Sequence, residues 1–131
     1  MESHFEKVKK FLFDLGFDLQ SEDADEELVV VTDEEKGISN LIIDCEGDLL
    51  LLEQYIFSLK DPADSKTLKR LLNINLNIVH GALGVDDENR VIFRDTLQLQ
   101  NMASNELESS INSIGLMMAE YAEEFIGFAK H

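Results

Sequence analysis

The sequence predicts an α+β fold in which helices pack on an antiparallel sheet, in the order α-β-β-β-α-β-β-α. Segments rich in β-branched and aromatic residues come in two blocks joined by short turns, as in antiparallel hairpins. Segments with helical spacing and a capping residue precede, separate and follow these two blocks. Such segregation of strands and helices is typical of α+β domains. With 131 residues and one proline, we expect a single domain over residues 1–131.

The first helix is predicted over residues 3–15. Ser3 and Glu6 form the S-x-x-E pattern of a capping box, and Gly16 is placed to end the helix. Phe13 points away from the apolar face, so we interpret it either as an ordinary exposed residue or as part of a partner-binding surface. The apolar face itself consists of Phe5, Val8, Phe11, Leu12 and Leu15.

An acidic loop is predicted over residues 20–27, followed by three strands of an antiparallel meander. The third strand begins with four consecutive leucines at positions 49–52, so both of its faces are apolar there. This pattern predicts burial on both sides, or a partner that covers one side. The three strands span residues 28–32, 38–45 and 49–59.

A second helix is predicted over residues 65–76, with Asp64 or Ser65 as its cap. The alternation of apolar and polar residues at 72–78 would also permit a strand, and the capping residue decides for the helix. A second hairpin follows, with strands at residues 80–86 and 90–99.

The last helix is predicted over residues 104–128, with Ser104 as its cap. An apolar stripe runs along its whole length, so this helix is expected to pack on the sheet. The stripe consists of Leu107, Ile111, Ile114, Met118, Tyr121, Phe125 and Phe128.

The chain is strongly acidic, with 27 Asp and Glu against 11 Lys and Arg, a formal charge of −16. Such a chain repels nucleic-acid phosphates and anionic membranes, so we expect neither as a partner. The acids form either a solvated coat or a surface offered to polypeptides. The single cysteine, Cys45, fits a reducing compartment, and the N-terminus shows no signal peptide, so the cytoplasm is expected.

The sequence shows no pattern of residues typical of catalysis, metal binding or cofactor binding. The histidines are His4, His80 and His131, and their spacing suggests neither a metal site nor a nucleophile–base pair. The carboxylates around Gly47 do not follow the calcium-loop pattern, and no glycine-rich phosphate loop is present. We therefore expect no catalysis, no cofactor and no metal.

The order of elements over almost the whole chain resembles that of a known group, and the best-matching stretch runs from Leu71 to Phe125. This stretch contains L-L-N-I-N at residues 71–75, H-G-A-L-G-V-D at 80–86, R-V-I-F-R at 90–94, D-T-L-Q-L at 95–99 and the long amphipathic helix after them. The chain thereby resembles the type III secretion chaperone-like superfamily, which includes the Tir-chaperone type and YbjN-like proteins. This resemblance implies a twisted antiparallel sheet with helices against it, commonly in a homodimer. It also implies a partner, a segment of a secreted protein held without a globular fold, and it implies no catalytic residues.

The leading interpretation is a dimeric, chaperone-like protein that covers apolar segments of a client. For each candidate residue the alternative is ordinary core or dimer packing. The candidates for client binding are Phe13, Leu50, Leu52, Ile56 and Leu116. The candidates for dimerisation are Leu68, Leu71, Leu72 and Leu76. A regulatory or scaffold protein with a folded partner, a small enzyme and an acidic mimic of nucleic acid remain as alternative functions.

Overall fold

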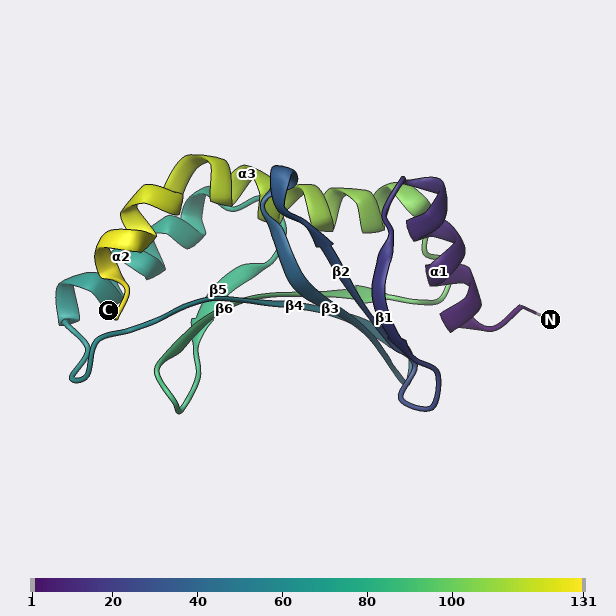
Figure 1. Cartoon of the computed structure of the whole chain (residues 1–131), viewed down its shortest axis with the longest axis horizontal. Coiled ribbons are helices and arrows are strands. Elements are labelled where there is room, and N and C mark those ends of the chain that lie inside the picture. Colours follow the sequence, from purple (N-terminus) through teal and green to yellow (C-terminus); the bar gives the residue numbers. More distant parts are fainter. Residues whose placement is uncertain (1, 131) are drawn as a thin grey trace.

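The computed structural model describes residues 2–130, which form helices and one sheet (Figure 1). The helices and strands follow the predicted order, with one additional strand near the N-terminus. Short 3₁₀ turns lie at Glu34–Lys36 and Asn75–Asn77. The elements are α1 (His4–Asp14), β1 (Leu19–Asp23), β2 (Leu28–Asp33), β3 (Ile38–Glu46), β4 (Leu49–Ser58), α2 (Ser65–Ile74), β5 (Ala82–Val85), β6 (Arg90–Gln98) and α3 (Ser104–Phe128).

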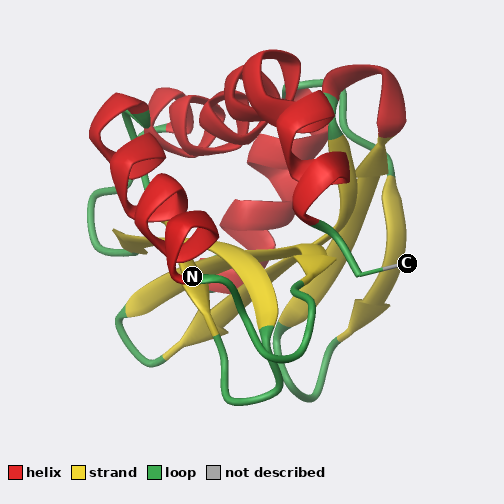
Figure 2. Ribbon diagram, turned by 90° about the vertical axis from the view of Figure 1, so that its left-hand side faces the viewer, coloured by secondary structure: helices red, strands yellow, loops and turns green. Residues whose placement is uncertain are grey.

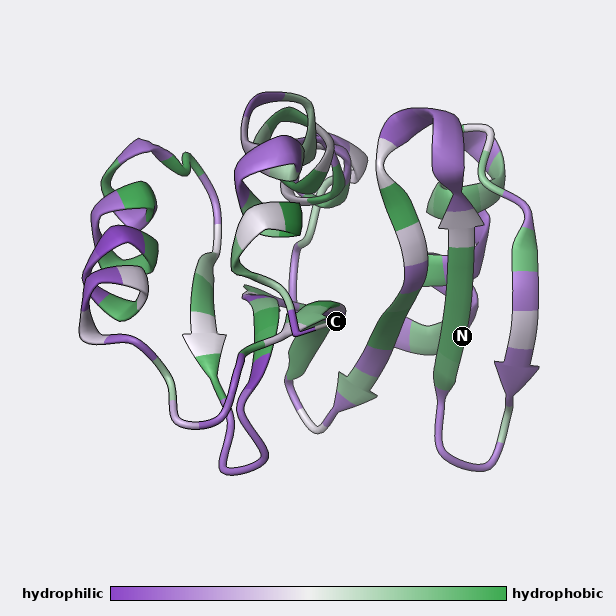
Figure 3. Ribbon diagram, turned by 60° about the vertical axis from the view of Figure 1, so that its left-hand side comes forward, coloured by the Kyte–Doolittle hydropathy of each residue, from purple (hydrophilic) through white to green (hydrophobic). Residues whose placement is uncertain are grey.

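The strands form one antiparallel sheet in the order β1-β2-β3-β4-β6-β5. The first four strands follow one another as a meander, and α2 carries the chain across so that β6 pairs with β4. The helices of residues 2–130 all lie on one side of the sheet, which curves around them (Figure 2). Hydrophilic residues gather at the turns (Figure 3), and the second side of the sheet is not covered by any element of residues 2–130.

The additional strand β1 corrects the prediction of an acidic loop over residues 20–27. It pairs with β2 from Leu19 opposite Val31 to Asp23 opposite Leu28. Apart from the half-buried Leu19, the residues of β1 are exposed. Because an edge strand is held by backbone hydrogen bonds on one side, it needs no alternation of apolar residues, and its sequence therefore lacks the pattern that predicts a strand.

Both ends of α1 agree with the prediction to within one residue. The Ser3 hydroxyl accepts a hydrogen bond from the Glu6 backbone N–H at 3.1 Å, as an N-cap should. The chain leaves the helix at Gly16, whose N–H donates to the Phe13 carbonyl at 3.0 Å. The second helix starts in the same way, because the Asp64 carboxylate accepts from the Lys66 N–H at 3.0 Å.

The core lies between the inward side of the sheet and the apolar faces of α1 and α3. Alternate residues of β2, β3, β4 and β6 point into it, as the period of two requires. The largest fully buried side chains include Leu12, Leu41, Ile43, Leu50, Leu52, Phe93, Leu107, Ile111 and Ile114. The predicted stripe of α3 is therefore largely confirmed, except that Met117 is buried more deeply than Met118.

The cap of α3 differs from the prediction. Ala103 occupies the N-cap position, and Ser104 is the first helical residue. The Ala103 N–H donates to the Glu106 carboxylate at 3.0 Å, so the glutamate three residues into the helix supplies the capping bond. The expected serine cap would have used a different bond, in which the hydroxyl accepts from a backbone N–H in the first turn of the helix.

Two glycines allow α3 to approach the turn between β2 and β3. A Cβ atom on Gly115 would lie 2.7 Å from the Lys36 carbonyl oxygen, and one on Gly37 would lie 2.9 Å from the Met118 Cβ. Gly37 also has a φ of +77°, which favours glycine. Backbone therefore meets backbone at this contact, which fixes where the middle of α3 sits over the sheet.

The position of α3 gives a matched test of burial with two isoleucines of the same helix. Ile114 is fully buried, whereas Ile126 is 64% exposed. We expect Ile114→Ala to lower the free energy of unfolding by about 2–5 kcal/mol, the usual cost of emptying a buried site. Ile126→Ala should change it by less than about 0.5 kcal/mol. Urea unfolding measures both, and equal effects would contradict the packing described here.

Candidate polypeptide-binding surfaces

The structure separates the predicted client-binding residues into exposed and buried ones. Phe13 on α1 is 79% exposed and Leu116 on α3 is 66% exposed. Leu50 and Leu52 are fully buried on the inward side of β4, so their assignment to a client-binding surface is wrong. Ile56 is half-buried at an irregularity of the β4–β6 pairing and packs against the core.

The four leucines of β4 divide by strand alternation. Leu50 and Leu52 point inward beneath the helices, while Leu49 and Leu51 point to the uncovered side of the sheet. Of the two apolar sides expected to be buried on β4, residues 2–130 bury only the inward one. On the other side Leu49 remains 42% exposed.

Leu116 stands between two hollows on the helix side of the molecule. The first, of about 330 Å³, is lined by Phe17, by Lys36 and Ile38 around the start of β3, and by residues of α3 that include Gly115. The second, of about 200 Å³, is lined by Val79, Met117 and Tyr121 among others. We call Leu116 with these two hollows the Leu116 surface. Phe13 lines neither hollow, so the structure does not bring it into one pocket with Leu116.

A second apolar surface lies on α2 and the neighbouring strand β5. Leu72 is 69% exposed and Leu76 is 82% exposed, whereas Leu71 is buried in the core. Half-buried Leu68 lines a hollow of about 300 Å³ together with Leu71, Leu72, Leu83, Gly84 and Val85. Among residues 2–130, β5 pairs with β6 alone, so its other edge is open beside this hollow. We call Leu68, Leu72, Leu76 and Val85 the α2–β5 surface.

An ion pair holds α2 against α3 and so orients this surface. Arg70 donates from Nε and Nη2 to the two carboxylate oxygens of Glu124, at 2.6 and 3.0 Å. The Arg70 guanidinium also lies over the Tyr121 ring, 5.7 Å from its centroid. The guanidinium lowers the pKa of the Glu124 carboxyl. With Arg70 directed toward α3, Leu72 and Leu76 are left exposed.

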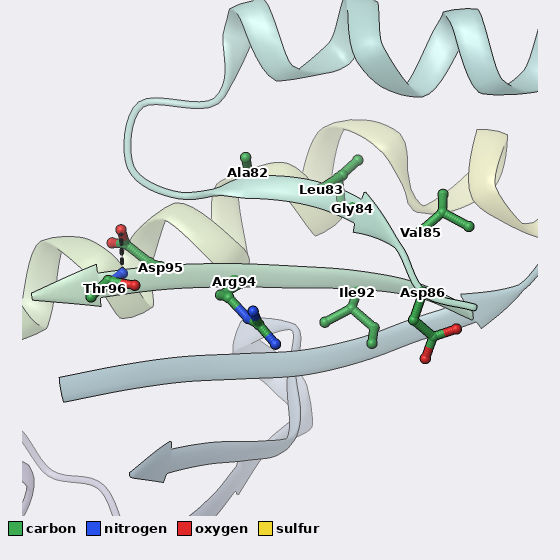
Figure 4. Close-up of a pocket in the computed structure, with 9 residues that line it drawn as sticks. All are labelled: Ala82, Leu83, Gly84, Val85, Asp86, Ile92, Arg94, Asp95 and Thr96. Carbon is green, nitrogen blue, oxygen red and sulfur yellow. Dashed lines mark hydrogen bonds between the residues drawn. The ribbon is translucent and has the colours of Figure 1, made fainter. Parts of the chain in front are cut away.

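The uncovered side of the sheet is the third surface, and we call it the open face. Two of its most exposed apolar residues are Ile42 and Tyr55. At its β5–β6 end is a hollow of about 550 Å³, where Ile92 and Arg94 project from β6 on the same side (Figure 4). Arg94 donates to the Glu53 carboxylate on β4 at 3.2 Å. The apolar residues of the open face are Leu28, Val30, Ile42, Leu49, Leu51, Tyr55 and Ile92.

Asp44 is placed among these apolar residues. It lies on β3 directly opposite Leu28 of β2 and Leu51 of β4. Its Oδ1 atom is buried and has no hydrogen-bond partner among the described residues. Burial, and then the neighbouring Glu46 carboxyl, raise the pKa of Asp44 to about 6. Burial also raises the pKa of the adjacent Cys45 thiol to about 11, so the thiol stays protonated.

The shifted carboxyl makes stability depend on pH. Because the pKa of Asp44 is higher in the folded state, the folded state holds more protons between about pH 4 and 6, and this group's contribution to stability is lost as pH rises through that window. Asp44→Asn should therefore stabilise the protein at about pH 8, by about 1 kcal/mol after allowance for solvent screening. Below about pH 4 the two proteins should unfold alike.

The matched control for this measurement is Asp25→Asn, which removes one charge from the exposed β1–β2 turn. Urea unfolding at the two pH values compares the variants. An effect of Asp44→Asn no larger than that of Asp25→Asn at about pH 8 would show that the carboxyl is well solvated.

The histidines considered as site residues in the sequence belong to no metal-binding cluster among the residues that the structure describes. The His80 backbone forms two hydrogen bonds with the Ser113 hydroxyl on α3. The His80 N–H donates to the hydroxyl at 3.2 Å, and the His80 carbonyl accepts from the hydroxyl at 2.7 Å. His131 lies outside the described residues. Within residues 2–130, no group of three or more His, Cys, Asp or Glu side chains is arranged to hold a metal ion. Over the same residues, no helix has the length and apolar character to span a membrane.

The family model CesT_Tir_1 matches residues 1–131. No curated protein sequence gives a significant match. YbjN from E. coli shares the fold with a TM-score of 0.70 and 16% identity, over 95% of this chain and 94% of that chain. The Yersinia pestis type III secretion chaperone SycH, solved with a stable fragment of YscM2, shares it with a TM-score of 0.60 and 13% identity, over 97% and 100%.

The ExoU–SpcU complex of the type III secretion system of Pseudomonas aeruginosa also contains this fold. The TM-score is 0.66 at 14% identity, covering 86% of this chain and 93% of that chain. At these identities the likeness shows a common fold. It agrees with the predicted twisted antiparallel sheet with helices packed against it.

Proposed function

The chain belongs to the CesT_Tir_1 family of type III secretion chaperones, and on that premise we propose that it binds an apolar segment of a client polypeptide without catalysing a reaction. The observation that carries the proposal is the Leu116 surface. A large aliphatic side chain stands 66% exposed between two hollows, where apolar side chains of a client would find room.

The physical chemistry of this surface suits a client segment of variable sequence. Apolar burial has no directional requirement, so a surface of this kind tolerates different client side chains. Phe13, exposed on α1, adds a second apolar contact at a distance from the hollows. The formal charge of −16 keeps the loaded complex soluble, and we place its action in the cytoplasm.

Client binding should depend on apolar contacts more than on charge. The client is first identified by co-purification from the native cell, and the bound segment is then titrated into the protein by calorimetry. We expect binding to survive at about 0.5 M salt, where the Debye length is only a few Å. Phe13→Ser and Leu116→Ser should each weaken binding about tenfold or more, since each removes one buried apolar contact.

Ile126→Ser is the matched control, because Ile126 is an exposed residue of α3 that lines neither hollow. Loss of binding at high salt, together with full binding by folded Phe13→Ser and Leu116→Ser proteins, would reject this mechanism. Recovery of an intact folded partner in place of a segment would favour a regulatory or scaffold role.

We further propose that two copies associate through the α2–β5 surface. This surface combines two exposed leucines, an apolar hollow and an open strand edge. Two chains of charge −16 repel each other overall, and α2 adds no negative charge to that repulsion. Its residues include Lys66, Lys69 and Arg70 and no acidic side chain.

The dimer is tested with a double variant that carries both Leu72→Ser and Leu76→Ser. Both side chains are exposed within the chain, so the variant should fold, and it should sediment as a monomer at micromolar concentration where the wild-type protein sediments as a dimer. Leu71 is left unchanged because it belongs to the core. A wild-type protein that is monomeric under the same conditions would overturn the proposal.

A further inference from the structure

The open face carries a patch of apolar side chains on β2, β3 and β4, with Glu46 beyond Asp44 on β3 and Glu53 of β4 opposite Ile42. Val30 lies directly opposite Ile42, and Leu51 lies opposite Asp44, which is itself opposite Leu28. Directly opposed residues have Cβ atoms about 5 Å apart, so these side chains form neighbouring rows. Ile42 and Leu49 are 41% and 42% exposed. The patch therefore surrounds a carboxylate with apolar side chains on three strands.

The backbone of this region limits what can lie on it. Each of β2, β3 and β4 already has a hydrogen-bonded neighbour strand on both sides. A segment laid across the face of these strands finds no free backbone donors or acceptors, so it must satisfy its own. An α-helix does this, whereas an added strand would pair only at the open edges of β1 or β5. A client held without a globular fold can still form a local helix.

The charge of the patch indicates which kind of helix would bind there. The Asp44 carboxyl shares a side-chain hydrogen bond with the Glu46 carboxyl, but its Oδ1 atom has no hydrogen-bond partner in residues 2–130. The neighbouring carboxylates Glu46 and Glu26 are negative as well, so neither supplies a cation. Arg94, the cation that projects onto this face from β6, is already paired with Glu53. A second copy of the chain would bring a second Asp44 to the same patch. A cationic side chain is the complement that Asp44 lacks.

We propose that the open face binds an amphipathic helix of the client whose apolar side carries one Lys or Arg that pairs with Asp44. The proposal rests on client binding as the function, and it names a second site and a chemical class of segment for it. Leu28, Val30, Ile42, Leu49 and Leu51 bury the apolar side of the helix. Rotation of the Asp44 carboxylate about χ2 presents either oxygen to the incoming cation.

The test uses two designed helical peptides of about five turns, with leucines along one side. One has a lysine at the centre of that side, and the other has glutamine there. We expect the lysine peptide to bind the wild-type protein about tenfold more tightly, as for a hydrogen bond to a charged group. Asp44→Asn should remove the difference, and Asp25→Asn should preserve it. Ile42→Ser should weaken both peptides, and Ile126→Ser should weaken neither.

Backbone amide shifts in NMR locate the bound peptide, and we expect them on β2, β3 and β4. Failure of the lysine peptide to bind, equal binding of the two peptides, a preference that survives Asp44→Asn, or shifts confined to α1 and α3 would each overturn the inference. Failure of this inference can be distinguished from failure of the proposed function. A native client whose binding depends on Leu116, beside peptides that ignore Asp44, would leave the Leu116 surface standing and remove the open face as a site.

Discussion

Burial on one side of a curved sheet is the constraint on which the rest of this structure depends. Alternation along β2, β3, β4 and β6 sends one set of side chains beneath α1 and α3, and these side chains with the stripe of α3 form the core. The same alternation sends the other set outward, where no element of residues 2–130 covers it. The apolar residues of that outward set therefore lie on the surface, because strand alternation directs them away from the helices.

Most exposed apolar residues fall on three separate surfaces, with Phe13 on α1 and Ile126 on α3 outside them, because the helices are held differently. The middle of α3 is fixed on the sheet by backbone contact at Gly115, which leaves Leu116 pointing outward. The second helix is held at its side by the pair between Arg70 and Glu124, while Leu72 on α2 and Leu76 in the 3₁₀ turn after it remain exposed for another surface. Each proposed contact thus depends on a specific internal contact that turns the side chains outward.

Most of the architecture could be predicted from the sequence because its signals are local. Capping by Ser3 and Asp64, the short turns and the stripe of α3 each appear in the sequence and in the structure. The edge strand β1 was missed since its stability comes from backbone pairing with β2, which leaves no apolar pattern. The four leucines of β4 could not be sorted into buried and exposed, because a run of identical residues contains no alternation and the helices decide which side is inward. The apolar surroundings of Asp44 could not be predicted, since its neighbours Leu28 and Leu51 are distant in sequence.

The close approach of α3 to the turn before β3 links ligand binding in the hollow beside Leu116 to the stability of the fold. Gly115 and Lys36 form that contact, and the same two residues line the hollow beside Leu116. A ligand seated in this hollow touches the folded arrangement of helix and turn and has no counterpart in the unfolded chain. By mass action such a ligand would stabilise the folded chain by RT ln(1 + L/Kd), with L the free ligand concentration, so the proposed complex should melt at a higher temperature than the empty protein, and release of the segment should return the chain to the less stable state.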